Sequence, residues 1–368
     1  MYTDESYLSD DDCHVLRPVR VADMLPAIEF DRLAFTRADV HELARGVQGN
    51  TSLVSLVLQG MLHRGVGGAE PVLRCLHPRS PLRCLALRNV GLRATDCATL
   101  ALFLPLHALG ELDLFHNEAM GNEGVATVAA LLPRSVHLTK LRLAAVGLGP
   151  AGCEALVRHL ADSCVQELDV GDNRIGDLGV AVLAQQLVEC KLIDLSLAWC
   201  DVGPAGCRAL QTLLPHSSLM SLDLGGNLLG GDGCGVDALA QCLAGCGLTR
   251  LGLSSTHSLR TNVLATLVQA VMGSCLQSLD LHYSNRGSRG GWPLQVALTV
   301  CDELDNSPYR SACRVPGVYR CSPMCVGDVV VIANVVMLSG ILPWLAAHPI
   351  QLYNPAGGSL YASHLTYG

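Results

Sequence analysis

Leucines recur along the chain in a pattern that combines two spacings. The sequence L-x-x-L-x-L-x-x-N occupies residues 109–117, 219–227 and, with Val165 as its first residue, 165–173. Related units begin at residues 25, 53, 82, 109, 138, 165, 192, 219, 248 and 276, so successive units are 27 to 29 residues apart. This regular spacing indicates an internal structural repeat along most of the chain.

Each unit combines the spacing of a strand with the spacing of a helix. The Leu-x-Leu segment alternates with a period of two, whereas the following dozen residues have helical spacing, with Leu156 and Leu160 on one face after Pro150. A single strand and helix cannot bury their apolar faces, so we expect the units to stack. The fold class predicted is α/β, a right-handed solenoid of about ten strand–helix units whose concave side carries a parallel sheet.

These motifs resemble the ribonuclease inhibitor-like class of leucine-rich repeats, which also occurs in Ran GTPase-activating proteins, NOD-like receptors and axonemal subunits. The resemblance extends from about Leu25 to Leu304, and the ninth position alternates between Asn and Val146, Cys200 or Thr256. It implies a horseshoe-shaped fold that hosts inhibitors, sensors, activators or scaffolds, so function must be argued from the surface. Structural roles at the turns are expected for Asn117, Asn173 and Asn227.

The chain divides into three segments. We expect residues 1–20 to form an acidic and flexible N-terminal segment, residues 21–304 the repeat array, and residues 305–368 an atypical uncharged, hydrophobic C-terminal cap or tail. A last helix is expected from about Trp292 to Leu304. The uncharged stretch from Val329 to Ala347 has the length of a membrane span. Three interpretations remain open: a cap on the array, a loosely ordered tail, or a membrane anchor.

The net charge and the cysteines indicate which partners and which cellular compartment to expect. The formal net charge is −8, which opposes binding to nucleic acid. The first twelve residues lack the basic and apolar regions of an export signal, so we expect a cytoplasmic, reducing location. The 17 cysteines are therefore expected to be free thiols, and many of them to fill the core.

No pattern in the chain predicts an enzyme. Gly147, Gly149 and Gly152 form a G-x-G-x-x-G sequence typical of dinucleotide sites, but glycines recur at matching positions of other units. The repeat therefore accounts for them without a cofactor. Cys313, Cys321 and Cys325 lack the paired spacing and the His partners of a zinc site. We expect no catalytic residue, cofactor or metal.

The candidate binding site is the concave face of the predicted sheet. Side chains at the third, fifth, seventh and eighth positions of a unit should point outward from the sheet, because strand residues alternate between its two sides. The acidic residues in these columns are Glu111, Asp113, Glu167, Asp169, Asp172, Asp194, Asp223 and Asp280. The basic residues are Lys140, Arg142 and Arg250, and the aromatic and His residues are Phe115, His116, Trp199, His282 and Tyr283.

Aromatic side chains in an acidic field are typical of protein interfaces. The sequence therefore predicts a non-enzymatic scaffold or structural subunit that binds a protein with a basic surface, in a cytoskeletal, axonemal or flagellar assembly. Two alternatives remain: a GTPase regulator resembling the Ran activator, and a tail-anchored membrane adaptor. A merely solvated concave face would also carry these charges.

Overall fold

The computed structural model describes most of the repeat array and a few segments after it. Described are residues 26–30, 43–45, 47–48, 50–60, 70–75, 81–103, 108–229, 234–256, 263, 266–267, 270–271, 274–280, 297–300, 329–332, 351–353 and 359–361. The proposed acidic N-terminal segment, residues 1–20, lies outside this part of the chain. So do most of residues 305–368, including all but the first four residues of the stretch from Val329 to Ala347.

Ten parallel strands follow one another in chain order, and each begins at the third residue of a repeat unit. They are β1 (Ala27–Phe30), β2 (Ser55–Gln59), β3 (Cys84–Arg88), β4 (Glu111–Asp113), β5 (Lys140–Arg142), β6 (Glu167–Asp169), β7 (Asp194–Ser196), β8 (Ser221–Asp223), β9 (Arg250–Gly252) and β10 (Ser278–Asp280). The predicted repeat and the α/β solenoid class are confirmed.

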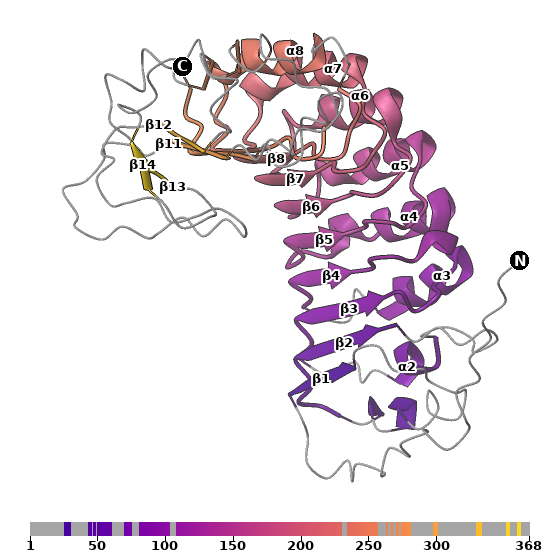
Figure 1. Cartoon of the computed structure of the whole chain (residues 1–368). Helices are drawn as coiled ribbons and strands as arrows, with labels where there is room; N and C mark the ends of the chain where they lie inside the picture. Colours follow the sequence, from indigo (N-terminus) through magenta and orange to yellow (C-terminus); the bar gives the residue numbers. More distant parts are fainter. Residues whose placement is uncertain are drawn as a thin grey trace, which may run out of the picture.

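Helices connect the strands and lie on the outer side of the arc, while the sheet lines its inner, concave side (Figure 1). They are α2 (Glu70–Cys75), α3 (Ala94–Phe103), α4 (Gly121–Ala129), α5 (Pro150–Leu160), α6 (Gly176–Gln186), α7 (Pro204–Leu213) and α8 (Cys234–Leu243). Short 3-10 turns are η3 (Glu118–Met120), η4 (Leu132–Arg134) and η5 (Leu214–His216). Each helix packs against the helix of the next unit, as expected of a solenoid.

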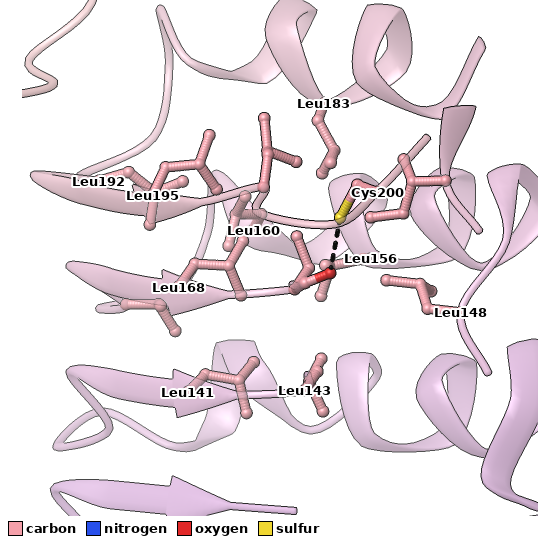
Figure 2. Packing of buried hydrophobic residues seen from close by; sticks show 14 of the residues in the cluster. Leu141, Leu143, Leu148, Leu156, Leu160, Leu168, Leu183, Leu192, Leu195 and Cys200 are labelled. Atoms are coloured by element: carbon pink, nitrogen blue, oxygen red, sulfur yellow. Dashed lines mark hydrogen bonds between the residues drawn. The ribbon is translucent and has the colours of Figure 1, made fainter. Parts of the chain in front are cut away.

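The core is one continuous layer between sheet and helices. Strand leucines such as Leu141, Leu143 and Leu168 face helix leucines such as Leu156 and Leu160, and all are buried (Figure 2). Alternation along each strand turns the fourth and sixth unit positions toward this layer, and the apolar residue at the first position, just before the strand, is also buried. The same alternation turns the intervening positions toward the concave surface, which places the candidate site.

The expected helix between Trp292 and Leu304 is wrong, because this range contains the strand β11 (Ala297–Val300). β11 pairs antiparallel with β10, and β12 (Val329–Ile332) pairs antiparallel with β11. Thr299 and Val300 are β-branched and favour extended backbone, and the chain reverses here instead of crossing over. β13 (Gln351–Tyr353) and β14 (Ser359–Tyr361) form a separate two-stranded sheet.

The uncharged stretch that begins at Val329 starts as a strand, β12, as its β-branched residues predict. In the described parts of the chain, no helix has the length and apolar character needed to cross a bilayer.

The glycines of the G-x-G-x-x-G sequence serve contacts between units. The Asn122 side chain in α4 accepts hydrogen bonds from the backbone N–H groups of Gly149 (2.8 Å) and Gly152 (3.1 Å) at the start of α5. A β-carbon at Gly152 would lie 2.6 Å from the Asn122 Oδ1 atom. Gly152 therefore allows a neighbouring unit to cap this helix, and the repeat explains the motif.

Candidate functional site

Two rows of side chains cross the concave face, one from the third and one from the fifth unit position. The register places Glu111 beside Lys140, Lys140 beside Glu167, and Glu167 beside Asp194 in the first row. In the second row, Asp113, Arg142 and Asp169 are neighbours. The candidate residues that the sequence assigned to separate units therefore lie on adjacent strands.

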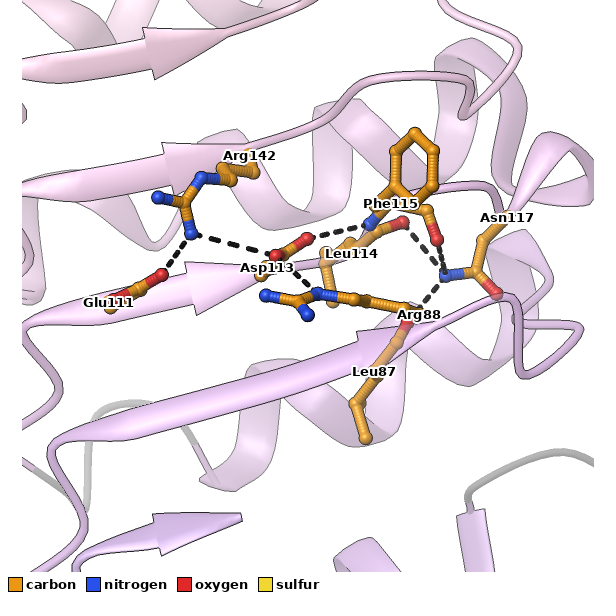
Figure 3. A network of polar contacts seen from close by, with 8 residues as sticks. All are labelled: Leu87, Arg88, Glu111, Asp113, Leu114, Phe115, Asn117 and Arg142. Carbon is orange, nitrogen blue, oxygen red and sulfur yellow. Dashed lines mark hydrogen bonds and ion pairs between the residues drawn. The ribbon is translucent and has the colours of Figure 1, made fainter. Parts of the chain in front are cut away.

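At β3–β5 the charges compensate one another (Figure 3). Arg88 donates a hydrogen bond of 2.7 Å to Asp113, and Arg142 pairs with Glu111 and lies 3.6 Å from Asp113. Asp113 is only 2% exposed, so it is not the solvent-facing acid that its position in the column predicted. The predicted columns begin at Leu109 and so omit Arg88, although Arg88 occupies the seventh position of the preceding unit.

Two further ion pairs neutralise acids on the first row. The Lys140 Nζ atom lies 2.9 Å from a Glu167 carboxylate oxygen, and an Arg250 guanidinium nitrogen lies 2.9 Å from Asp194. Both pairs are exposed, so each contributes little to stability. Their effect is on the charge pattern, since they leave these two acids compensated.

Acidic side chains on β6 and β8 remain without such compensation. Asp169, Asp172 and Asp223 make no ion pair with any residue that the structure describes, and of the three, Asp169 lies beside a cation, Arg142, which is itself paired with Glu111. Burial, together with the charges of Asp280, Asp169 and Asp194, raises the pKa of Asp223 above its ordinary value, although the Gly225 N–H group acts in the opposite direction. The acids of the concave face that form no such ion pair therefore lie at β6 and β8.

The acids of the fifth position also shape the ends of the strands. Their Oδ1 atoms accept a hydrogen bond from the backbone N–H two residues on, at 3.0 Å for Asp113 to Phe115, 3.0 Å for Asp169 to Gly171 and 2.8 Å for Asp223 to Gly225. An Asp side chain stabilises a turn in this way. The column thus has a structural role in addition to its charge.

Trp199 is the main aromatic group on the described part of the concave face. Its side chain is 57% exposed, and its indole ring lies against Gly226, where a β-carbon would approach the ring to 2.2 Å. Gly226 thereby provides a flat surface on which the indole rests. Both residues have a positive φ, 56° for Trp199 and 71° for Gly226. The turn therefore fixes an exposed indole between the acidic units β6 and β8.

Phe115 and His116 lie farther along the sheet, beside the compensated cluster. Both are exposed, and their ring centroids are 5.7 Å apart. They are separated from Trp199 by the units of β5 and β6. His282 and Tyr283 lie outside the described residues, and the final member of the acidic column, Asp280, ends β10.

The asparagines at the ninth position are buried and bind the backbone of two units. The Asn117 Oδ1 atom accepts hydrogen bonds from the N–H groups of Val90 (3.1 Å) and Leu92 (3.0 Å), and its Nδ2 group donates to the Leu87 carbonyl (2.7 Å). Equivalent bonds are made by Asn173 and Asn227. A buried amide whose donors and acceptor are all used holds the turn and offers nothing to a ligand.

Cys200 takes part of this role in an alternate unit. Its thiol donates to the Val170 carbonyl oxygen at 3.2 Å, as the equivalent Asn117 does to Leu87 (Figure 2). Among the described residues, no cluster of His, Cys, Asp and Glu side chains has the makings of a metal site.

Comparison with known proteins supports the repeat class. A family model described as a leucine-rich repeat matches residues 109–129, 161–184 and 189–210. The ribonuclease inhibitor of Sus scrofa is 33% identical over 234 residues, which are 60% of this chain and 51% of the inhibitor. NACHT, LRR and PYD domains-containing protein 5 of Homo sapiens is 34% identical over 284 residues, 73% of this chain and 23% of that protein.

The solved structure of a TLR13–ssRNA13 complex matches this chain with a TM-score of 0.44 and 20% sequence identity. The match covers 71% of this chain and 36% of that structure. The chain spans about half the length of the ribonuclease inhibitors it matches. The repeated motif, the ten parallel strands in one open sheet and the similarity to ribonuclease inhibitors show that the chain is a leucine-rich repeat protein of the ribonuclease inhibitor-like class.

Proposed function

We propose that the protein is a non-enzymatic interaction subunit that binds a partner protein with a basic surface through the units of β6–β8 on its concave face. The observation that carries the proposal is the uneven charge compensation of that face. Acids on β4 form ion pairs with Arg88 and Arg142, whereas Asp169, Asp172 and Asp223 form no ion pair with a described residue, although Asp169 lies beside Arg142 on the neighbouring strand.

Charge complementarity gives such a face its selectivity. Acidic side chains that do not pair within the chain attract a basic partner, and they raise the rate of encounter more than they slow dissociation. Burial raises the pKa of Asp223 in the free protein, and repulsion by Asp280, Asp169 and Asp194 raises it further. A bound cationic surface would relieve this repulsion, so binding and charge are coupled here.

Trp199 supplies the short-range contact. An exposed indole held on a rigid backbone can bury a large apolar area with little loss of conformational freedom. Its flanking acids, Asp172 and Asp223, would direct a Lys or Arg side chain toward the ring, where a cation is attracted to the aromatic face. We therefore expect Trp199 to make the main short-range contact and the acidic side chains to attract the basic partner from a distance.

The test uses affinity purification from cells with three forms of the protein. The acid variant carries Asp169→Asn, Asp172→Asn and Asp223→Asn, which remove three charges while positions 169 and 223 keep the side-chain oxygens that accept the turn hydrogen bonds. The matched control carries Glu154→Gln, Asp162→Asn and Glu189→Gln, which remove the same charge from helix α5 and from loops. Recovery of basic partners should fall at least about tenfold with the acid variant and stay unchanged with the control.

Trp199→Ala should weaken binding of the same partner by about 2 kcal/mol or more, measured by titration calorimetry. Equal recovery of the partner by the wild type, the acid variant and Trp199→Ala would refute the concave interface.

Ribonuclease binding is a second candidate function, favoured by the similarity to two ribonuclease inhibitors. Because the chain covers about half of each inhibitor, this activity needs its own test. Titration of a purified ribonuclease with the protein, beside lysozyme as an unrelated basic protein, distinguishes a specific complex from general attraction. A ribonuclease complex that persists at a salt concentration that releases lysozyme would support this function.

The proposed setting is the cytoplasm, in a cytoskeletal or flagellar assembly. The same purification separates this setting from the two alternatives. Cytoskeletal or axonemal subunits among the partners would support it, a small GTPase would favour the regulator, and recovery with membranes only after detergent would favour the adaptor.

A further inference from the structure

Several helices of the array end at a small polar side chain that lies two residues before the next unit. The hydroxyl groups of Ser163 and Ser217 donate to the carbonyl oxygen three residues earlier, at 2.6 and 2.8 Å, and accept the N–H two residues later. Ser274 makes the same two bonds at 2.8 and 3.2 Å. These serines cap the end of one helix and the start of the next strand segment.

Cys246 occupies this capping position after α8. Its thiol contacts the Leu243 carbonyl oxygen at 3.5 Å, and the Leu248 N–H group bonds to its sulfur. Cys190 is the equivalent residue after α6 and bonds to the Leu192 N–H group. The position therefore accepts either Ser or Cys, and a Cys→Ser change at Cys246 keeps a cap that the array already uses.

A second thiol lies one helical turn before Cys246. The Cys242 sulfur, near the end of α8, lies 3.1 Å from the Leu239 carbonyl oxygen and is within hydrogen-bonding reach of the Cys246 sulfur. The chain continues to turn after α8, where the Gly245 N–H group donates to the Cys242 carbonyl oxygen at 3.0 Å and the Cys246 N–H group to the Leu243 carbonyl oxygen at 3.4 Å, so this turn brings the two thiols together. At the corresponding position before Cys190 stands Gln186.

We propose that Cys242 and Cys246 form an oxidation-sensitive thiol pair, a modification site that a peroxide converts to a disulfide. The Cys246 thiolate attacks one peroxide oxygen, the O–O bond breaks, and a sulfenic acid and one water molecule form when hydrogen peroxide is the oxidant. The Cys242 sulfur then attacks the Cys246 sulfur and displaces the hydroxyl group as a second water molecule. Two thiols lose two electrons in total, and the peroxide gains them.

The surroundings of the two sulfurs assign their roles. The hydrogen bond from Cys242 lowers the pKa of Cys246 and raises that of Cys242, so Cys246 is the nucleophile and Cys242 the resolving thiol. Burial raises the pKa of Cys190, which has no such donor. Both members of the pair are 5% exposed, but Ala244, Gly245 and Gly247 around them are exposed, so a small oxidant approaches through this turn.

The experiment treats the native full-length protein with hydrogen peroxide and follows each cysteine by differential alkylation and peptide mass spectrometry. We expect a Cys242–Cys246 disulfide to form at least about tenfold faster than oxidation of Cys190, the internal control at the same capping position. In Cys242→Ala, Cys246 should stop at the sulfenic or sulfinic acid. In Cys246→Ser, Cys242 should remain a thiol, and circular dichroism checks that the fold is kept.

Three results would overturn the proposal. Oxidation of Cys190 at the same rate as Cys246 would show that the pair has no special reactivity. Persistence of both thiols after Cys190 has reacted would show that the pair is inert. Equal oxidation of Cys242 in the wild type and in Cys246→Ser would show that the two sulfurs act independently.

Discussion

Some single residues of the concave face contribute both a charge and a structural hydrogen bond. At Asp223 a substitution can separate these two contributions. Its raised pKa means that the folded protein binds the proton of this carboxyl more tightly than the unfolded chain does. The stability that this gives is present below the unfolded pKa and is lost as the pH rises through the folded pKa, so ionised Asp223 costs stability at neutral pH. Asp223→Asn keeps an oxygen for the Gly225 N–H group.

We therefore expect Asp223→Asn to raise the free energy of unfolding at pH 7 slightly, by about 0.5 kcal/mol or less, and the gain to vanish near pH 3. Urea unfolding at the two pH values measures the difference. A variant that is less stable than the wild type at pH 7 would show that the carboxylate charge itself stabilises the fold.

The backbone at Asp201 makes a second prediction at the residue scale. Asp201 has a φ of 56°, whereas Gly91 and Gly147 take the equivalent left-handed conformation in two other units. Asp tolerates this region less well than glycine. Asp201→Gly should therefore stabilise the protein by about 0.5 kcal/mol, while Asp201→Ala should destabilise it, as measured by urea unfolding. The opposite order would mean that the Asp201 side chain compensates for its backbone.

At the scale of the elements, two kinds of strand–helix unit alternate along the array, so the pattern repeats every second unit. A side chain in one helix caps the next helix, as Asn122 does for α5, and Asp177 does for α7. Asp177 accepts the N–H groups of Gly203 and Gly206 at 2.7 and 2.8 Å. The buried asparagines occur in every second unit as well. Helices and turns thus alternate between two kinds of unit, one that donates a cap and one that receives it.

Asp177→Ala removes the cap of α7 and should cost about 1 to 2 kcal/mol. Asp177→Asn is the matched control, since Asn122 already fills this role, and it should cost under about 1 kcal/mol through loss of the charge at the helix N-terminus. The midpoint of urea unfolding measures both. If Asp177→Asn is as damaging as Asp177→Ala, the charge and not the accepted hydrogen bonds holds the helix.

How far the sequence predicts each element depends on how strongly a pattern is repeated. Every strand from β1 to β10 begins where the leucine spacing places it, because a shift by one residue would turn the leucines out of the core. The strand β11 escaped prediction because the leucine repeat has ended there, so no repeated spacing indicates the type of element. The burial of Asp113 was not predicted either. Its position in the repeat places the side chain on the concave face but does not indicate that a cation, here Arg88, covers it.

At the scale of the whole molecule, the extensive contacts among the described repeat units join neighbours along the array. A local defect should therefore spread a short distance. Leu168→Asp places a charge at a site that is 2% exposed in β6, at a cost of more than about 4 kcal/mol. Hydrogen exchange should show loss of protection in β5–β7, with β2 and β3 still protected.

The control for this defect is Leu178→Asp, at a position in α6 that is 74% exposed, which should change stability by less than about 0.5 kcal/mol. Uniform loss of protection from β2 to β10 in Leu168→Asp would show that the array unfolds as a single cooperative unit.

The central claim is that a partner covers the acidic half of the concave face, and hydroxyl-radical footprinting of the native complex tests it even while the partner is unidentified. Trp199 and Leu178 are both exposed and both oxidised by the radical, but they lie on the concave face and on helix α6 respectively. Compared with the free protein, the complex should show strong protection of Trp199 and unchanged oxidation of Leu178. Protection of Leu178 with Trp199 still fully oxidised would contradict the claim and place the interface on the helices.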